Sequence, residues 1–153
     1  MQELLIQYED KLGKKIDRCG EVFRTARAVL LDEAGRTLRG ALQGHLSSSG
    51  LQDRDGKVSG WQRVYRGSGG GYVAVRALAG ATGPDSPGAI TNYLESGHRV
   101  RYPSGKSERY RPRVRVARAR AFRFYKATQA EARQLGERWA NELERRLKES
   151  LEA

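Results

Sequence analysis

Apolar side chains in the first third of the chain recur every three or four residues, as on one face of a helix. A helix over residues 2–46 would be roughly 65–70 Å long at ~1.5 Å per residue, which is long for a compact small domain. Each glycine inside it costs about 1 kcal/mol relative to alanine. We therefore expect a break between Gly13 and Gly20, with the longer helix starting at about Asp17. The apolar series is Leu5, Tyr8, Leu12, Ile16, Cys19, Phe23, Ala26, Leu30, Ala34, Leu38, Ala41 and His45.

The middle of the chain changes from helical to strand-like patterning. Serine, aspartate and glycine in residues 47–50 and 53–56 are typical of turns. We expect two strands, over residues 58–66 and 72–78, joined by the glycine-rich residues 67–71 as a hairpin loop. A short helix is expected over residues 89–96, with Gly97 just past its end.

A second hairpin is expected over residues 99–116. Arg111, Arg113 and Arg115 then point to one side of a strand, and Val114 and Val116 point to the other. The alternation slips after this point, which predicts a bulge or a strand end near residue 117.

The last thirty residues carry the most regular pattern of the chain. Glu142 with Arg146, and Glu144 with Lys148, are oppositely charged pairs four residues apart in the order that stabilises a helix. We expect a C-terminal amphipathic helix that packs on the sheet or on the first helix. Its apolar stripe is Thr128, Ala132, Leu135, Trp139, Leu143, Leu147 and Leu151. The predicted fold is α+β: one domain over residues 1–153, with a long N-terminal helix, a small antiparallel sheet of two hairpins and a long C-terminal helix, and with residues 99–116 as a protruding basic hairpin.

Composition adds that the core is lean. Only 38% of the residues are hydrophobic, and the mean hydropathy is −0.73. One cysteine, Cys19, permits no internal disulfide and fits a reducing compartment. No apolar run approaches the ~18 residues that span a membrane, and the N-terminus lacks the layout of a signal peptide, so we expect a protein that functions without a membrane.

Positive charge is concentrated in one segment. Residues 99–123 hold ten basic side chains and one acidic one, Glu108, and so supply +9 of the net charge of +11. Such a segment attracts a polyanion or an acidic protein face. Arginine suits both, because its planar fork binds phosphate and carboxylate groups bidentately. No base-reading motif accompanies the segment, so any contact with nucleic acid would be independent of sequence.

Catalytic chemistry is not indicated. The GKS at residues 105–107 lacks the glycine of a phosphate-binding loop five positions earlier, where Val100 stands. His45 and His98 are too far apart in sequence for an ordinary metal site. A surface pair of Glu95 with His98, and a buried Cys19 thiol, are the simpler interpretations. We expect no enzyme activity, no metal and no cofactor.

Three short stretches carry a family resemblance. Residues 92–98, Asn-Tyr-Leu-Glu-Ser-Gly-His, resemble a tyrosine–x–glutamate–aromatic–glycine–threonine element. Residues 119–122, Ala-Arg-Ala-Phe, resemble an alanine–arginine–proline–phenylalanine lead-in to a final helix. Either residues 49–51 or residues 59–61 resemble a threonine–glycine–x–leucine turn after a first long helix. In this order the elements resemble the tail-component family of long-tailed bacteriophages, which includes tail-completion or neck proteins and is similar to the minor tail protein Z group.

The resemblance implies a non-enzymatic virion protein that forms a ring between the head connector and the tail tube, with DNA passing through. Six copies are favoured and twelve are the alternative. The implied partners are further copies of the chain, the neighbouring connector and tail-terminator or tail-tube rings, and packaged DNA through nonspecific contact. Its location is the virion neck, and the host cytoplasm during assembly. The alternative function is a free nucleic-acid-binding protein without sequence preference.

Two sets of residues are candidates for contacts. A helix stripe packs against the core or a neighbouring subunit, through Leu135, Trp139, Leu143 and Leu147. The basic hairpin faces either DNA in the lumen or an acidic ring next to it. DNA has to slide through a neck, which favours an acidic protein face for most of these residues. They are Arg99, Arg101, Lys106, Arg109, Arg111, Arg113 and Arg115.

Overall fold

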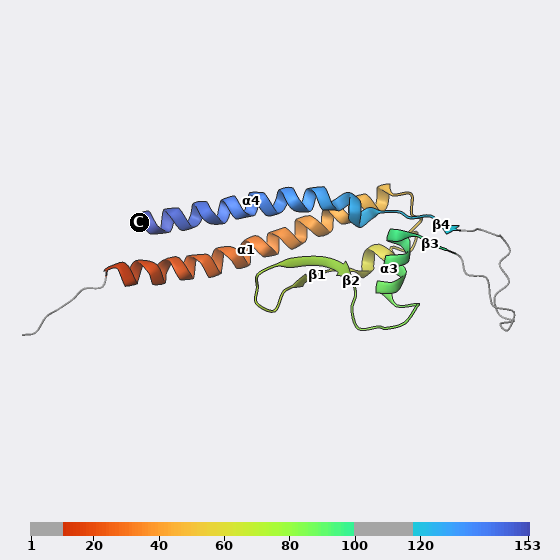
Figure 1. Ribbon diagram of the computed structural model, residues 1–153, viewed down its shortest axis with the longest axis horizontal. Coiled ribbons are helices and arrows are strands. Elements are labelled where there is room, and N and C mark those ends of the chain that lie inside the picture. The colour runs from red at the N-terminus through yellow and green to blue at the C-terminus, as the bar shows by residue number, and fades with distance from the viewer. Residues whose placement is uncertain (1–10, 100–117) are drawn as a thin grey trace, which may run out of the picture.

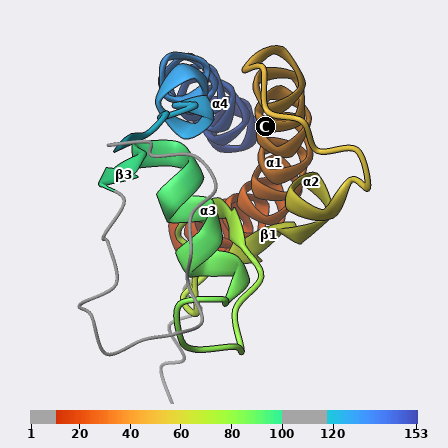
Figure 2. The same cartoon turned by 90° about the vertical axis from the view of Figure 1, so that its right-hand side faces the viewer.

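The computed structural model describes residues 11–99 and 118–153. Two long antiparallel helices, α1 and α4, lie side by side (Figure 1). The β1–β2 hairpin, α2 and α3 lie along one side of this pair, and β3 and β4 lie beyond the end where α4 begins. The end-on view separates the helical layer from the hairpin and the short helix (Figure 2). This α+β architecture confirms the predicted fold class. The elements are α1 (Lys11–Ser48), α2 (Lys57–Trp61), β1 (Gln62–Arg66), β2 (Val73–Ala77), α3 (Pro87–Ser96), β3 (His98–Arg99), β4 (Arg118–Ala119) and α4 (Phe124–Glu152).

Helix α1 is continuous from Lys11, so the expected break between Gly13 and Gly20 is wrong. Packing against α4 and the hairpin outweighs the modest cost of each glycine. Its buried stripe also differs from the predicted one at the C-terminal end, where Leu42 and Leu46 replace Ala41 and His45 in the core. The buried side chains of α1 therefore recur every four residues. Side chains at this spacing form a ridge that packs into the groove of a second helix crossing at an angle.

A five-residue helix, α2, occupies the start of the predicted strand at residues 58–66, and the strand begins only at Gln62. The carboxylate of Asp53 accepts hydrogen bonds from the backbone N–H groups of Val58, at 3.0 Å, and Ser59, at 2.8 Å. Gly56 adopts the left-handed conformation, with φ of 61°, that turns the chain into this helix. The aspartate thus stabilises a helical turn in a stretch whose side chains favour a strand.

Strands β1 and β2 form an antiparallel hairpin with Val64 opposite Val75. The predicted glycine-rich loop joins them, and it is closed by a 3.0 Å hydrogen bond from the N–H of Gly67 to the carbonyl of Tyr72. One face of the hairpin rests on α1 at Gly35. A Cβ atom at Gly35 would lie 2.4 Å from a methyl carbon of Val64 and 3.0 Å from one of Val73, so the absence of a side chain lets the hairpin approach.

The second pair of strands forms a separate two-stranded sheet instead of extending the first one. His98 lies opposite Ala119, and Arg99 lies opposite Arg118. The remainder of the second predicted hairpin, and the predicted irregularity near residue 117, lie outside the described residues. The predicted short helix before this sheet is confirmed: α3 begins after the capping Ser86.

Helix α4 confirms the predicted C-terminal helix, and it packs on α1 as expected. Phe124 at its start forms the most deeply buried cluster with Leu42 and Leu46 of α1. His45 and Glu131 add a 2.7 Å polar contact across the helix pair. The core is lean, as predicted from composition. Among the described residues the buried apolar side chains are Ala26, Leu30, Ala34, Leu42, Leu46, Phe124 and Leu135.

Replacing Gly35 tests whether the hairpin is seated on α1. We expect Gly35→Ala to destabilise the fold, because overpacking costs about 1–3 kcal/mol and exceeds the gain in helix propensity of about 1 kcal/mol. The matched control is Gly40→Ala in the same helix, where an added Cβ meets nothing within 4 Å. The control should gain up to about 1 kcal/mol in urea unfolding. Equal gains for both variants would contradict the close contact.

Candidate partner interface

The predicted basic interface is described only at its base. Arg99 is exposed in β3 and lies directly opposite Arg118 of β4, so the two flanks of the basic segment are joined in one short sheet. The other predicted contact residues lie outside the described residues. They are Arg101, Lys106, Arg109, Arg111, Arg113 and Arg115.

Gly97 brings the end of α3 against the end of β4 and the residues that follow it. Its φ of 66° is in the left-handed region that favours glycine, and its N–H donates a 2.8 Å hydrogen bond to the carbonyl of Tyr93 to close α3. An added Cβ would lie 2.6 Å from the carbonyl oxygen of Ala119 and 3.0 Å from the nitrogen of Ala121. Conformation and space both require glycine here.

Glu95 links α3 to the first turn of α4. Its carboxylate accepts hydrogen bonds from the N–H groups of Tyr125, at 2.9 Å, and Lys126, at 3.0 Å. In return, Phe122 donates its N–H to the carbonyl of Leu94 at 2.9 Å. The exposed ends of two helices thus satisfy each other, and the negative charge of the carboxylate lies where the α4 dipole favours it. The expected surface pair of Glu95 with His98 is therefore wrong.

A hydrogen-bonded polar pair, with Gln62 buried and Tyr125 half-buried, adjoins this junction. The Tyr125 hydroxyl donates a hydrogen bond to Oε1 of Gln62, and Nε2 of Gln62 donates to the carbonyl of Val58 at 3.0 Å. Gln62 has no exposed surface, so both ends of its amide need these partners. Burial raises the pKa of Tyr125 to about 12, with a further rise from the nearby Glu95 carboxylate, and so the hydroxyl stays protonated as a donor.

A largely apolar hollow of about 300 Å³ lies between α1, β2 and the first half of α4. Leu38, Val75 and Ala132 are among the side chains that line it, and Glu95 and Tyr125 of the junction contribute polar atoms. The fold leaves this apolar surface incompletely covered.

The predicted packing stripe of α4 faces α1 but is buried to different extents. Leu135 is buried, whereas Trp139, Leu143 and Leu147 are half-buried. Trp139 lines two shallow hollows at the groove between α1 and α4, together with Leu30 of α1. The Cys19 thiol, expected to be buried, is half-buried. Ile16, near the N-terminal end of α1, is 57% exposed, although it lies on the predicted apolar face.

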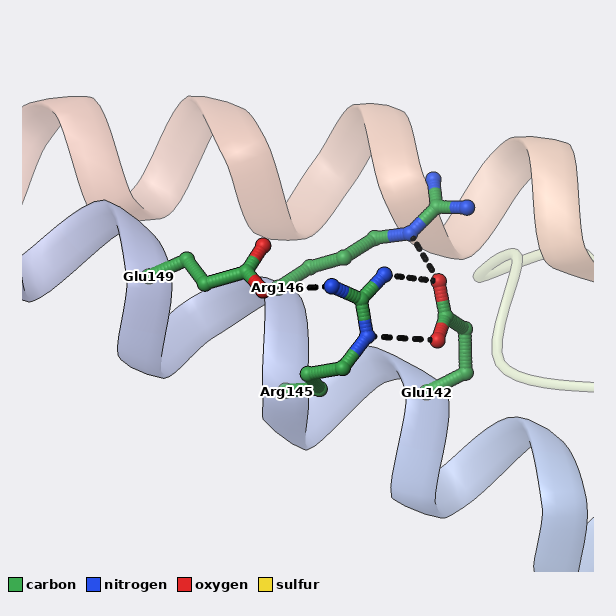
Figure 3. A network of polar contacts seen from close by, with 4 residues as sticks. All are labelled: Glu142, Arg145, Arg146 and Glu149. Carbon is green, nitrogen blue, oxygen red and sulfur yellow. Dashed lines mark hydrogen bonds and ion pairs between the residues drawn. The ribbon is translucent and has the colours of Figure 1, made fainter.

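Charged side chains on α4 are paired along the helix. Figure 3 shows Arg145 between Glu142 and Glu149, with Arg146 also directed to Glu142. The Glu142 carboxylate accepts hydrogen bonds from Arg145 at 2.9 and 2.8 Å and from Arg146 at 2.7 Å. These hydrogen bonds, first from Arg145 and then from Arg146, lower the pKa of Glu142 to about 2. The two predicted pairs, Glu142 with Arg146 and Glu144 with Lys148, are both confirmed at 2.7 Å.

The described residues contain neither a candidate metal cluster nor a helix that could span a membrane. Within residues 11–99 and 118–153, no group of three or more histidine, cysteine, aspartate or glutamate side chains is placed to hold a metal ion. No helix in this part of the chain is long and apolar enough to cross a bilayer. No protein-family model, curated protein or solved structure matches the chain.

The roles of Gln62 in β1, Gly35 in α1 and Arg118 in β4 were not predicted from the sequence. Gln62 could have been noticed as an inward-facing polar residue in an alternating strand. Gly35 looks in sequence like any other helix glycine, since its role depends on which residues of the hairpin meet it. Arg118 falls outside the predicted hairpin, although its pairing with Arg99 extends the basic face.

Glu95→Ala tests the link between the helices. We expect a loss of about 1–2 kcal/mol in urea unfolding, because a helix cap and its charge are removed together. Faster amide hydrogen exchange at Tyr125 and Lys126 should accompany the loss. Glu137→Ala, an exposed change on α4 outside the junction, is the control and should leave both measurements nearly unchanged. Unaltered exchange in the Glu95 variant would show that the cap is unimportant.

The pKa of the Glu142 carboxylate should lie far below the ordinary value of a glutamate. Since its folded pKa is lowered to about 2, its contribution to stability is present above the unfolded pKa of roughly 4.3 and is lost as the pH falls through about 2. A ¹³C NMR titration of the side chain should give a midpoint near that value. In Arg145→Gln the midpoint should rise, because the largest cause of the shift is removed. An unchanged midpoint in this variant would exclude Arg145 as the cause.

Proposed function

We propose that this chain is a non-enzymatic structural subunit of a long-tailed bacteriophage virion. It assembles into a tail-completion or neck ring that joins the head connector to the tail tube, and DNA passes through the ring. Six copies are favoured, with twelve as the alternative. Its partners are other copies of itself and the rings above and below.

One contact carries the proposal. Two of the stretches that resemble the tail-component family, residues 92–98 and residues 119–122, lie far apart in sequence and yet touch. Gly97 of the first fits against the backbone at Ala119 and Ala121 of the second, and Leu94 accepts the N–H of Phe122. The two stretches that resemble the family therefore act together in the structure, because their contacts fix the start of α4. Glutamate and glycine at these positions are explained by that task, as they would be in a family that keeps one fold for assembly.

The distribution of apolar surface also supports an assembling subunit. The buried apolar core is small, and several large apolar side chains of the described residues stay exposed along the length of the molecule. Such side chains gain by association, at roughly 25 cal/mol for each Å² removed from water. They are Leu12, Ile16, Val29, Val64, Tyr72, Leu78, Tyr93 and Leu151.

A second candidate function, free sequence-independent binding of nucleic acid, is favoured by the +9 carried by residues 99–123. Free binding of nucleic acid does not explain why the chain has a long pair of helices. Particle sizing of the pure protein and a DNA titration separate the two functions, because only the second predicts tight binding by the monomer.

Cryo-electron microscopy of the native particle tests the ring directly. We expect density for this chain as a closed ring between head and tail, because head-to-tail contacts of identical subunits close when their rotation permits. Purified protein without its neighbouring rings is a weaker test, since assembly can depend on them. An isolated monomer in the particle would defeat the proposal.

Changing Arg111, Arg113 and Arg115 together to glutamine tests the role of the basic segment. If the segment contacts an acidic neighbouring ring, tails should fail to join heads, because charge pairs across an interface fix partner and register. If it faces the lumen, particles should join but lose DNA. Assembly is followed by electron microscopy and DNA retention by nuclease protection. Normal, infectious particles would contradict both roles.

A further inference from the structure

The outward face of the β1–β2 hairpin carries an unusual pair of charges. Arg63 of β1 lies directly opposite Arg76 of β2, and both are exposed. Like charges in this position destabilise a sheet, because the two Cβ atoms are only about 4.5–5.5 Å apart. Among residues 11–99 and 118–153, neither guanidinium has a carboxylate partner. On the opposite face, by contrast, Arg66 is paired with Asp32 of α1.

One of the two arginines is held in place by an aromatic ring. The guanidinium of Arg76 lies 4.3 Å from the ring centroid of Tyr65, which shares the outward face of the hairpin with Arg63. The hydroxyl of Tyr65 in turn accepts a 2.9 Å hydrogen bond from the N–H of Ala79. The positive charge is therefore positioned at the surface, where an anion can reach it.

The second small sheet also places two arginines opposite each other. Arg99 and Arg118 are directly opposite each other in β3 and β4, are both exposed, and have no carboxylate partner within the described parts of the chain. Both sheets therefore place two like charges where repulsion is greatest. A bound anion between the two side chains would convert this repulsion into attraction.

We propose that Arg63 and Arg76 together bind one backbone phosphate of a nucleic acid, without regard to its sequence. Each guanidinium presents a fork of N–H donors that matches phosphate oxygens, and two forks can hold a single phosphate from both sides. A second copy of the chain is a poor source of the anion, since it carries the same net charge of +11. The carboxylates of Glu142, Glu144 and Glu149 on α4 are already paired within their own helix.

This site goes beyond the proposed ring and needs only the folded monomer. If the chain forms the proposed ring, this site requires that the outward face of the β1–β2 hairpin points toward the DNA in the lumen. Only this orientation rests on the proposed function. One phosphate per subunit is a weak contact that breaks readily, which is compatible with DNA that has to slide.

NMR of the full-length protein with a short DNA duplex at low salt tests the site. We expect the Nε–H resonances of Arg63 and Arg76 to shift and to saturate together. These resonances report on the hairpin itself, so DNA bound only elsewhere on the basic chain does not shift them. Their apparent Kd should rise with salt, with a slope of about 0.9 in log K against log salt for one phosphate. Resonances that stay fixed while DNA binds would overturn the proposal.

A double-mutant cycle tests whether the two arginines share one phosphate. Each of Arg63→Gln and Arg76→Gln should weaken binding at the hairpin roughly tenfold, read from the remaining arginine. The double variant, read from the amide resonances of the hairpin, should be hardly weaker than either single variant, because the phosphate is already lost. Arg133→Gln, an exposed change on α4, is the control and should bind as the parent does. Losses that simply multiply would mean separate contacts and would overturn the shared site.

Two further measurements test the site: urea unfolding of a single variant, and titration of the protein with polyglutamate. Arg63→Gln should unfold at a higher urea concentration than the parent, since the repulsion is relieved while the contact of Arg76 with Tyr65 is kept. A lower midpoint would mean that Arg63 supports the hairpin and would overturn the proposal. Polyglutamate should shift the two Nε–H resonances far less than DNA does. An equal shift would assign the site to an acidic protein surface instead. All of these results are independent of ring formation, so they fail or succeed separately from the proposed function.

Discussion

The packing of α1 against α4 supports the β1–β2 hairpin and α3. Its centre is the contact of Phe124 with Leu42 and Leu46, where the start of one helix meets the end of the other. A two-stranded hairpin is at best marginally stable in water, so β1 and β2 depend on seating Val64 over Gly35 of α1. The short helix α3 is likewise fixed at the point where Glu95 holds the first turn of α4. The helix pair supplies the stability, and the small sheets remain available to present side chains.

Elements that repeat one local pattern over many residues could be predicted from the sequence. The apolar stripe from Thr128 to Leu147 correctly predicted α4, and Gly97 correctly predicted the end of α3. Predictions failed where a contact at a distance reverses the local preference. Asp53 binds amides five and six residues ahead and makes a helical turn from a strand-like sequence. The break expected between Gly13 and Gly20 is absent because tertiary packing stabilises α1 by more than its glycines cost.

The sequence predicted where positive charge is concentrated in the candidate interface, but not which basic side chains lie opposite each other. A count of residues is enough to place the positive charge in residues 99–123. The opposed arginines depend on register, and a shift of one residue would place Arg63 opposite Val75 or Ala77 instead of Arg76. Glu95 looked like a neighbour of His98 because its true partners, the amides of Tyr125 and Lys126, lie about thirty residues further along the chain.

Charge is managed differently on the helices and on the sheets. Along α4, the glutamates Glu142, Glu144 and Glu149 pair with Arg145, Arg146 and Lys148 of the same helix. On the hairpin, the repulsion between Arg63 and Arg76 remains, and the contact with α1 has to offset it. A ligand that binds only the folded form stabilises that form. On the proposed role of the pair, a bound phosphate would therefore strengthen the seating of the hairpin at Gly35. Conversely, a hairpin displaced from α1 would lose the geometry that brings the two arginines to one anion, so that binding at the sheet and packing on the helix pair depend on each other.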